Sequence, residues 1–188
     1  MARQGLNTDR VVAEALDLLD EKGFEALSLA ALAARLDVKV PSLYKHIEGL
    51  GDLRTKLYRH VNDELFDALD TAAQQARGRD AVYALAQAYH EYVTTRRGRF
   101  EVTAYGRGGK IDPTERYFRL LESVVADSGV AADRVGDATF ALAATMRGVE
   151  QLRKLGIYGD QDTAVRVFHV LVDRLLDAYA EGEDAAAG

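Results

Sequence analysis

The stretch that decides the fold, residues 28–53, reads SLAALAARLDVKVPSLYKHIEGLGDL. Its first part places Leu29, Leu32 and Leu36 on one stripe of a helix that begins after the capping residue Ser28. The tight connection DVK follows, and then a second helix too short to be stable alone in water. Two helices joined by such a turn form a helix-turn-helix, so the stretch predicts that motif.

Each position in this stretch has a physical role in the motif. Ala33 is small where the two helices cross, and Asp37 occupies a turn that needs a left-handed backbone, which Asp tolerates better than most residues. Pro41 fits the first turn of the second helix, where its missing N–H costs nothing. We expect Val38 and Leu43 to point to the core and hold the short helix in place.

The other side chains of the short helix then face outward and are the candidate DNA contacts. A lysine can bind a phosphate or the acceptors of guanine, and serine and tyrosine hydroxyls can donate to phosphate oxygens. The first N–H groups of the long helix that follows would form a further phosphate seat. The candidate DNA-binding residues are Lys39, Val40, Ser42, Tyr44, Lys45 and His46.

Composition and charge are compatible with this prediction. The chain has 188 residues, no cysteine and a formal net charge of −6. Residues 1–60 hold nine Lys/Arg and nine Asp/Glu, so the later part carries the whole negative charge, and an electrostatically polarised molecule can present one end to phosphate. Without cysteines, an apolar leader or a membrane-length apolar run, we expect a cytoplasmic protein with no membrane partner.

Apolar spacing predicts helices along almost the whole chain, which indicates an all-α fold. Asn7 is a plausible N-cap of the first helix and Gly23 its stop. The segment from Gly98 to Pro113 is the least regular part, and residues 181–188 are expected to be a disordered tail. The expected helices cover residues 7–23, 28–36, 53–77, 79–97, 113–128, 133–155 and 162–180.

The last two helices suggest a subunit interface. The final one has apolar residues on more than one face and little polar surface in its middle. The preceding helix carries the small residues Ala141, Ala144 and Gly148, spaced so that another helix could approach closely. The alternative is that both are core helices of a monomer.

The run A-x-x-L-x-V-x-x-x-x-L-Y-x-H from Ala33 to His46, preceded by LLDEKGFEALSL, resembles the DNA-binding domain of the TetR family of transcriptional regulators. That family usually has Gly at Asp37, Ser or Thr at Lys39, and often a lysine at Leu50. The resemblance implies a three-helix helix-turn-helix head at residues 1–52, called here the DNA-binding head, and a larger helical ligand-binding and dimerisation domain at residues 53–180. It further implies a homodimer that binds a double-stranded DNA operator, responds to a small-molecule effector and most often represses.

Two other constellations carry no chemistry. In YGRGGK, Tyr105 to Lys110, Ala104 stands where a phosphate loop needs its first glycine and Ile111 where it needs a hydroxyl. The four histidines are scattered without metal-ligand spacing, and no nucleophile motif occurs. We therefore expect no metal, no cofactor and no catalytic residues.

A ligand pocket is expected among aromatic and polar residues of the larger domain. For Arg147 the alternative is a salt bridge within the chain or across a dimer, with Glu150 as a possible partner, and for the tyrosines it is core packing. A small-molecule-binding protein with a degenerate DNA-binding head is the alternative for the whole chain, and a helical enzyme is disfavoured. The candidate ligand-binding residues are Tyr89, Tyr92, Phe100, Tyr105, Phe118 and Arg147.

Overall fold

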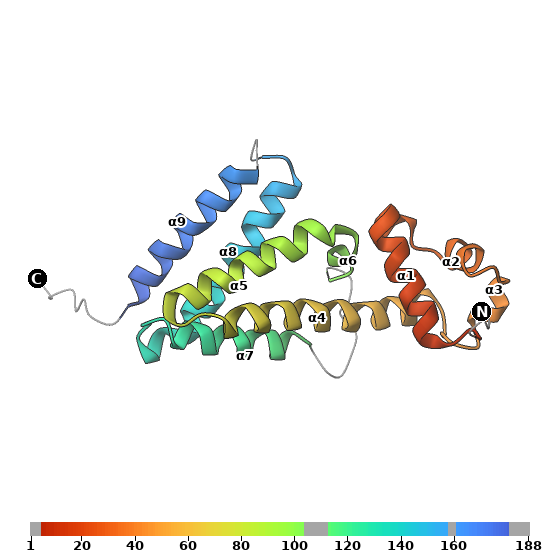
Figure 1. The fold of residues 1–188 in the computed structure, drawn as a ribbon, viewed down its shortest axis with the longest axis horizontal. Helices are drawn as coiled ribbons and strands as arrows, with labels where there is room; N and C mark the ends of the chain where they lie inside the picture. Colours follow the sequence, from red (N-terminus) through yellow and green to blue (C-terminus); the bar gives the residue numbers. More distant parts are fainter. Residues whose placement is uncertain (1–4, 104–112, 158–160, 181–188) are drawn as a thin grey trace, which may run out of the picture. The chain divides into compact units, whose positions relative to one another are not determined.

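The computed structural model describes residues 5–103, 113–157 and 161–180, and within them regular structure consists of helices and one isolated β-bridge, Val130 to Ala180 (Figure 1). The predicted all-α class is confirmed. The helices are α1 (Thr8–Lys22), η1 (Phe24–Ala26), α2 (Leu29–Arg35), α3 (Val40–Leu43), α4 (Leu50–Gln74), α5 (Gly78–Thr95), α6 (Arg97–Val102), α7 (Pro113–Ala126), η2 (Ala132–Arg134), α8 (Val135–Lys154) and α9 (Gln161–Tyr179).

Local capping explains where the first helices begin and end. The Asn7 side chain accepts a hydrogen bond from the Arg10 amide at 2.8 Å, and α1 stops at Gly23, whose φ is 78°. The Ser28 side chain accepts one from the Ala31 amide at 3.1 Å and starts α2. These groups satisfy backbone donors that a helix end leaves open, and the predicted caps are confirmed.

Helix α6 lies in a segment that the sequence predicted to be irregular. Gly98, in its first turn, packs directly on the end of α1: a Cβ at this position would lie 1.9 Å from the Leu19 carbonyl oxygen. The glycine is therefore a contact residue that lets two backbones meet, rather than a sign of loop structure. Residues 104–112, which include Tyr105 and the YGRGGK stretch, lie outside the described residues.

The chain divides into two compact units. Unit 1 comprises Met1–Glu64 and Tyr92–Pro113, and unit 2 comprises Leu65–Glu91 and Thr114–Gly188. Helices α4 and α5 each contribute residues to both units. The expected functional boundary at residues 52 and 53 falls in the first turn of α4 and stays a prediction, and the expected tail at 181–188 lies outside the described residues.

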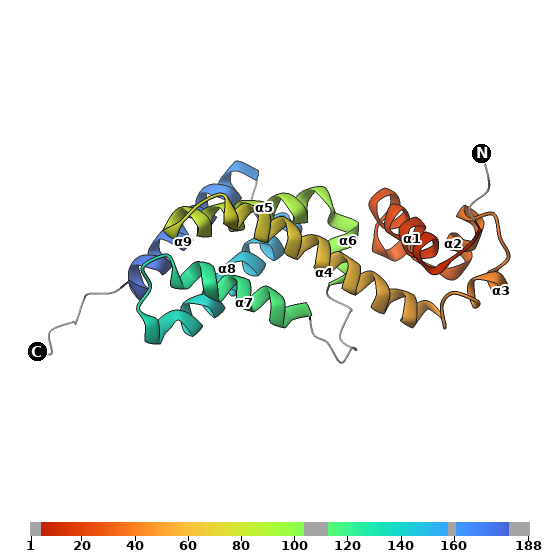
Figure 2. The same ribbon diagram turned by 60° about the horizontal axis from the view of Figure 1, so that its bottom comes forward.

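Unit 2 is built around the packing of α8 along α9, which the ribbon shows side by side (Figure 2). In α9, Phe168, Val172 and Leu176 are buried at four-residue spacing, whereas Val170 and Leu171 are 58% and 43% exposed. The predicted two-faced apolar character of this helix is therefore present in the folded chain. One face completes the core of unit 2, and the other lies on its surface.

Candidate nucleic-acid interface and ligand pocket

The second helix of the helix-turn-helix is held in place by one fully buried side chain. Helix α3 covers Val40–Leu43, with Leu43 at 0% exposure, and a turn continues the chain to His46. The amides of His46 and Ile47 donate to the Leu43 carbonyl at 2.9 and 3.0 Å. The Thr8 hydroxyl donates to the His46 carbonyl at 3.2 Å, which ties the end of the turn to the first residue of α1.

With Leu43 pointing inward, the candidate DNA contacts gather on the outer side of the same turn. Tyr44 is 55% exposed and Lys45 is also exposed, as is Lys39 just before α3. The side chains of Val40, Ser42 and His46 are half-buried. The structure therefore brings the six residues together on one short segment with its cations and its tyrosine in solvent.

The turn between α2 and α3 has the predicted strained backbone. Asp37 has φ 54°, the only described non-glycine residue in the left-handed region, which confirms the prediction made for this position. The Val38 amide donates to the Ala33 carbonyl at 3.0 Å and closes the turn. The Ala33 side chain is 3% exposed. A short aspartate adopts this backbone at lower cost than a branched or bulky residue.

Two of the basic residues near this segment form ion pairs within the chain. The Arg35 guanidinium contacts Glu14 at 2.7 Å and Glu21 at 2.6 Å, which joins α2 to α1 and raises the pKa of Arg35. Lys56 contacts Asp52 at 2.5 Å, and Asp52 also accepts from the Glu48 amide at 3.0 Å. These two cations stabilise the fold, so the candidate phosphate contacts centre on Lys39 and Lys45.

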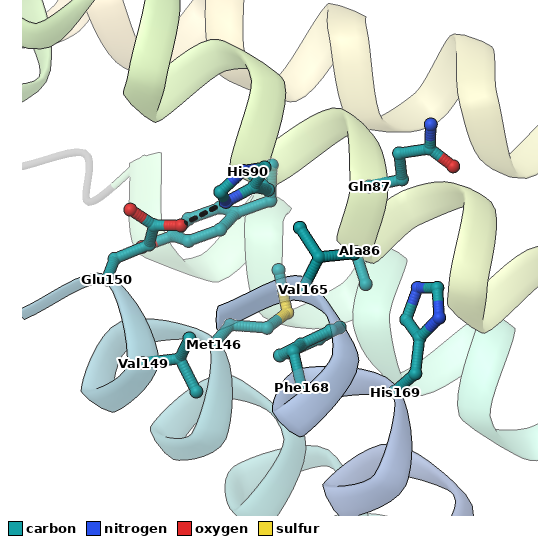
Figure 3. A pocket seen from close by; sticks show the side chains of 10 residues that line it. Ala86, Gln87, His90, Met146, Val149, Glu150, Val165, Phe168 and His169 are labelled. Atoms are coloured by element: carbon teal, nitrogen blue, oxygen red, sulfur yellow. Dashed lines mark hydrogen bonds and ion pairs between the residues drawn. The ribbon is translucent and has the colours of Figure 1, made fainter. Parts of the chain in front are cut away.

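A pocket of about 340 Å³ lies within unit 2 between α5, α8 and α9 (Figure 3). Its wall includes Glu150, which is 5% exposed and accepts from the His90 Nδ1 at 2.5 Å and the Arg153 Nε at 2.7 Å. Burial acts to raise the pKa of Glu150, but the His90 and Arg153 hydrogen bonds outweigh it and hold the pKa below its ordinary value. The lining residues are Ala86, Gln87, Tyr89, His90, Met146, Val149, Glu150, Val165, Phe168 and His169.

Comparisons with known proteins agree with this architecture. The family model described as bacterial regulatory proteins, tetR family, matches residues 11–46, which contain α2, α3 and most of α1. The chain is 30% identical over 175 residues to the uncharacterized HTH-type transcriptional regulator Rv0681 of Mycobacterium tuberculosis, covering 90% of this chain and 80% of that protein. The chain belongs to the TetR family of bacterial transcriptional regulators.

Solved structures share the fold of this TetR-family regulator. A protein of unknown function from Rhodococcus sp. RHA1 superimposes with a TM-score of 0.80 at 21% identity, covering 96% of this chain and 98% of that one. A TetR variant from Acinetobacter baumannii AYE in complex with minocycline superimposes with a TM-score of 0.68 at 21% identity, covering 93% and 97%. The named relatives are regulators rather than enzymes, and the chain carries a DNA-binding helix-turn-helix.

The structure separates the residues that sequence reasoning grouped as ligand contacts. Tyr89 lines the pocket, and Arg147 lies exposed on α8 with its guanidinium beside the Tyr89 hydroxyl. Tyr92 and Phe100 belong to unit 1. Phe118, in α7, is half-buried with its ring 5.5 Å from that of Tyr117.

The Tyr89 hydroxyl is one neighbour of the Arg147 guanidinium. Glu150, one turn later, pairs with His90 and Arg153. Burial raises the pKa of Tyr89, and the Arg147 guanidinium beside it acts in the opposite direction. Burial also raises the pKa of Tyr117, the nearby Tyr89 hydroxyl acts in the same direction, and the Arg147 guanidinium acts in the opposite direction. Helices α5, α7 and α8 therefore each contribute a residue to one polar cluster.

Sequence reasoning missed most of the residues that line the pocket. His90 and Glu150 are 60 positions apart in the chain, and only the packing of α5 on α8 makes them neighbours. A local signal existed, because Glu150 stands beside Val149 on the apolar side of α8, where a carboxylate needs a partner. Among the described residues, no group of three or more His, Cys, Asp or Glu could hold a metal ion, and none of the described helices has the length and apolarity to span a bilayer.

Unit 1 contains a second buried ionic cluster, centred on Arg99 of α6. Arg99 is 8% exposed and contacts Asp20 of α1 at 2.6 Å and Glu64 of α4 at 2.7 Å. The Tyr92 hydroxyl donates to Glu64 at 3.0 Å, and Arg96 contacts Asp20 at 3.1 Å. Through these pairs, residues from α5 and α6 are attached to the first helix of the DNA-binding head.

Proposed function

We propose that this regulator is a homodimeric repressor that binds a pseudo-palindromic operator and is released by a small molecule. The observation that carries the proposal is the pocket in unit 2, an apolar hollow whose wall contains a buried, hydrogen-bonded carboxylate. Apolar pockets with a few placed polar groups are typical of small-molecule sites. The minocycline complex of the Acinetobacter TetR variant, a protein of similar fold, supports the same use of this architecture.

Dimerisation is supported by the outward faces of α8 and α9. Phe140 is 69% exposed, and Val170 and Leu171 are also in solvent in the single chain. Ala144 and Gly148 leave room on α8 for a close helix approach. Covering these surfaces with a second copy would bury large apolar side chains that a monomer leaves in water.

In such a dimer the two copies of α3 would enter successive major grooves, roughly 34–36 Å apart. Lys39, Val40, Ser42, Tyr44, Lys45 and His46 would supply the phosphate and base contacts, with residues 1–52 as the DNA-binding head and residues 53–180 as the ligand-binding and dimerisation domain. The site of action would be chromosomal DNA in the cytoplasm.

Ligand response would pass through α5. His90 lines the pocket in unit 2, and Tyr92, two residues later on the same helix, bonds Glu64 in unit 1. A ligand that shifts α5 would therefore alter the Arg99 cluster that holds α1. The coupling free energy equals the ligand's preference for one state, typically about 1–3 kcal/mol, and operator must weaken ligand binding by the same factor.

The test begins with an operator selected from random duplexes. Fluorescence anisotropy over a salt series should show affinity falling steeply between about 50 and 200 mM salt, as expected for a protein that neutralises several phosphates. Sedimentation should give two chains per duplex. Ligands found by thermal shift are then titrated with and without operator: equal affinities would refute release by ligand, and a salt-independent or undetectable DNA signal would favour a degenerate head.

A further inference from the structure

The pocket of unit 2 is mainly apolar, with a polar pair at one end. His90 of α5 and Glu150 of α8 face each other there, joined by the hydrogen bond drawn in Figure 3. Met146 and Phe168 lie away from this pair, and both are buried. A thioether sulfur and an aromatic ring both make favourable contacts with the ring of a ligand. An aromatic ligand would therefore place its ring on the methionine and the phenylalanine and a polar group toward the His90–Glu150 pair.

The volume sets the size of the ligand. The pocket, at about 340 Å³, lies near the lower limit of the range of about 300–1,000 Å³ that is typical of small-molecule sites. A single ring with a short substituent suits this space better than a large polycycle. In a ligand of this size one functional group determines the charge, so the polar end of the pocket selects the chemical class.

The polar end is balanced in charge before any ligand binds. Glu150 accepts from His90 Nδ1 at 2.5 Å on one carboxylate oxygen and from Arg153 Nε at 2.7 Å on the other. With a neutral His90, the Arg153 guanidinium balances the one carboxylate among the described residues that line the pocket, and those residues include no lysine or arginine. Arg147 lies outside this lining, with its guanidinium beside the Tyr89 hydroxyl. An ionic group on a ligand would therefore meet, among the described lining residues, a carboxylate that is already paired.

Glu150 still has the capacity to accept a hydrogen bond. An ionised carboxylate has about four lone-pair sites and no proton to donate, and the bonds from His90 and Arg153 use two of the sites. A ligand hydroxyl can donate to a remaining site without displacing either partner. A ligand carboxylate has no proton to donate and is repelled by Glu150. A ligand ammonium loses its hydration in an apolar hollow, where Arg153 already balances the negative charge.

We propose that this pocket takes a small uncharged aromatic alcohol, with its hydroxyl donating to Glu150 and its ring on Met146 and Phe168. The assignment rests on the proposed role of unit 2 as the ligand-binding part of the regulator. Burial of a hydroxyl that finds an acceptor costs far less than burial of an ion, so the class follows from the burial and the pairing of Glu150.

Four probes of similar shape test the assignment: 2-phenylethanol, its methyl ether, phenylacetate and phenethylammonium. In NMR titrations of the full chain, 2-phenylethanol should bind at least about tenfold more tightly than either charged probe. It should bind at least about threefold more tightly than the ether, which has no proton to donate. A smaller preference over either ion overturns the uncharged class, and a smaller preference over the ether overturns the contact with Glu150. Absence of 2-phenylethanol binding at about ten millimolar overturns the site.

The E150Q variant tests the role of charge. The amide keeps an acceptor oxygen but leaves the Arg153 guanidinium without its carboxylate, so phenylacetate should gain on 2-phenylethanol by at least about tenfold. E122Q, at an exposed glutamate of α7, should leave the ratio of the two affinities unchanged. A smaller gain in a folded E150Q overturns the proposed binding mode.

The V165F variant tests the position of the ring and does not depend on the stability of E150Q. Val165 lines the pocket from α9, and the larger phenylalanine side chain there should lower 2-phenylethanol affinity at least about tenfold by occupying the space for the ligand. V167F, at a half-buried valine of the same helix outside the lining, should bind 2-phenylethanol as the wild type does. Far-UV circular dichroism checks that each variant folds. An affinity in V165F equal to that in V167F overturns the placement of the ring.

Operator anisotropy, run in parallel, separates this assignment from the proposed function. If 2-phenylethanol binds with the expected preference and operator affinity stays constant, the ligand class stands and release by this ligand fails. If phenylacetate or phenethylammonium binds best and weakens operator binding, ligand response stands and the uncharged class fails.

Discussion

Replacing Gly98 with alanine tests whether the close approach of α6 to α1 holds unit 1 together. The new Cβ would lie 1.9 Å from the Leu19 carbonyl oxygen, 2.7 Å from the Leu19 carbonyl carbon and 3.3 Å from the Gly23 Cα. All three atoms are backbone, so no side-chain rotation relieves the overlap. An ordinary contact needs at least 3.4 Å, and α6 would therefore have to retreat by about 1.5 Å.

That retreat also affects the next residue. Arg99 holds Asp20 with its Nε at 2.9 Å and its Nη2 at 2.6 Å, and a displacement of this size would take both beyond hydrogen-bond distance. Overpacking costs about 1–3 kcal/mol and loss of a charged hydrogen bond a further 1.5–3, while alanine in a helix returns about 1. We expect G98A to lower the free energy of unfolding by about 1.5–5 kcal/mol, which corresponds to a Tm about 3–20 °C lower.

The matched control is Gly51 in α4, where a Cβ meets nothing within 4 Å. Urea and thermal unfolding of the wild type, G98A and G51A should be compared at one fixed protein concentration, because the proposed dimerisation would make Tm depend on concentration. G51A should be neutral or slightly stabilising. A G98A variant as stable as G51A would show that α6 is not held against α1 as the structure indicates.

Three other substitutions examine the two sites and the surface. K45A should weaken operator binding about 5- to 150-fold and flatten its salt dependence with Tm unchanged, whereas K22A, on α1, should do neither; an unfolded K45A would make that lysine structural. E150Q should lower the free energy of unfolding by about 1–3 kcal/mol at neutral pH. Because the folded-state pKa of Glu150 lies below its ordinary 4.5, its ionic contribution is present above pH 4.5 and disappears as pH falls through the lower value. The Tm values of the wild type and E150Q should therefore converge in thermal scans at acid pH. F140E should convert a dimer to monomers in sedimentation, whereas A126E, on the exposed side of α7, should not; a dimeric F140E would place the interface elsewhere.

The helix-turn-helix could be predicted from sequence because its determinants are local. Ser28 caps the helix that it precedes, Asp37 takes the left-handed backbone of its own turn, and Leu43 is buried by the periodicity of its neighbours. Each of these depends on residues a few positions away. The long helices were predictable for the same reason, since their apolar residues recur at helical spacing.

The pocket could not be predicted because its residues meet only through tertiary packing. His90, Glu150 and Phe168 come from three helices, and helical spacing does not reveal which helix packs on which. The selection of aromatic residues by type included Tyr92, which belongs to unit 1 and whose hydroxyl donates to Glu64. Gly98 misled in a similar way: a glycine required by close packing looks the same in sequence as a glycine required by a loop.

The helix-turn-helix of this regulator is stabilised by a part of the chain that follows it by many residues. The Asp20 carboxylate of α1 accepts hydrogen bonds from Arg96 and Arg99, which lie 76 and 79 positions later in the chain. Gly98 packs directly on the end of the same helix. The partners of the Asp20 carboxylate and the residue that packs on the end of α1 thus come from residues 96–99, and not from the sequence neighbours of α1. Because α6 follows the helix that carries His90, the proposed ligand response through α5 would act on the same contacts that complete the fold of unit 1. Under that proposal, the stability of α1 and the response to ligand would depend on the same few residues.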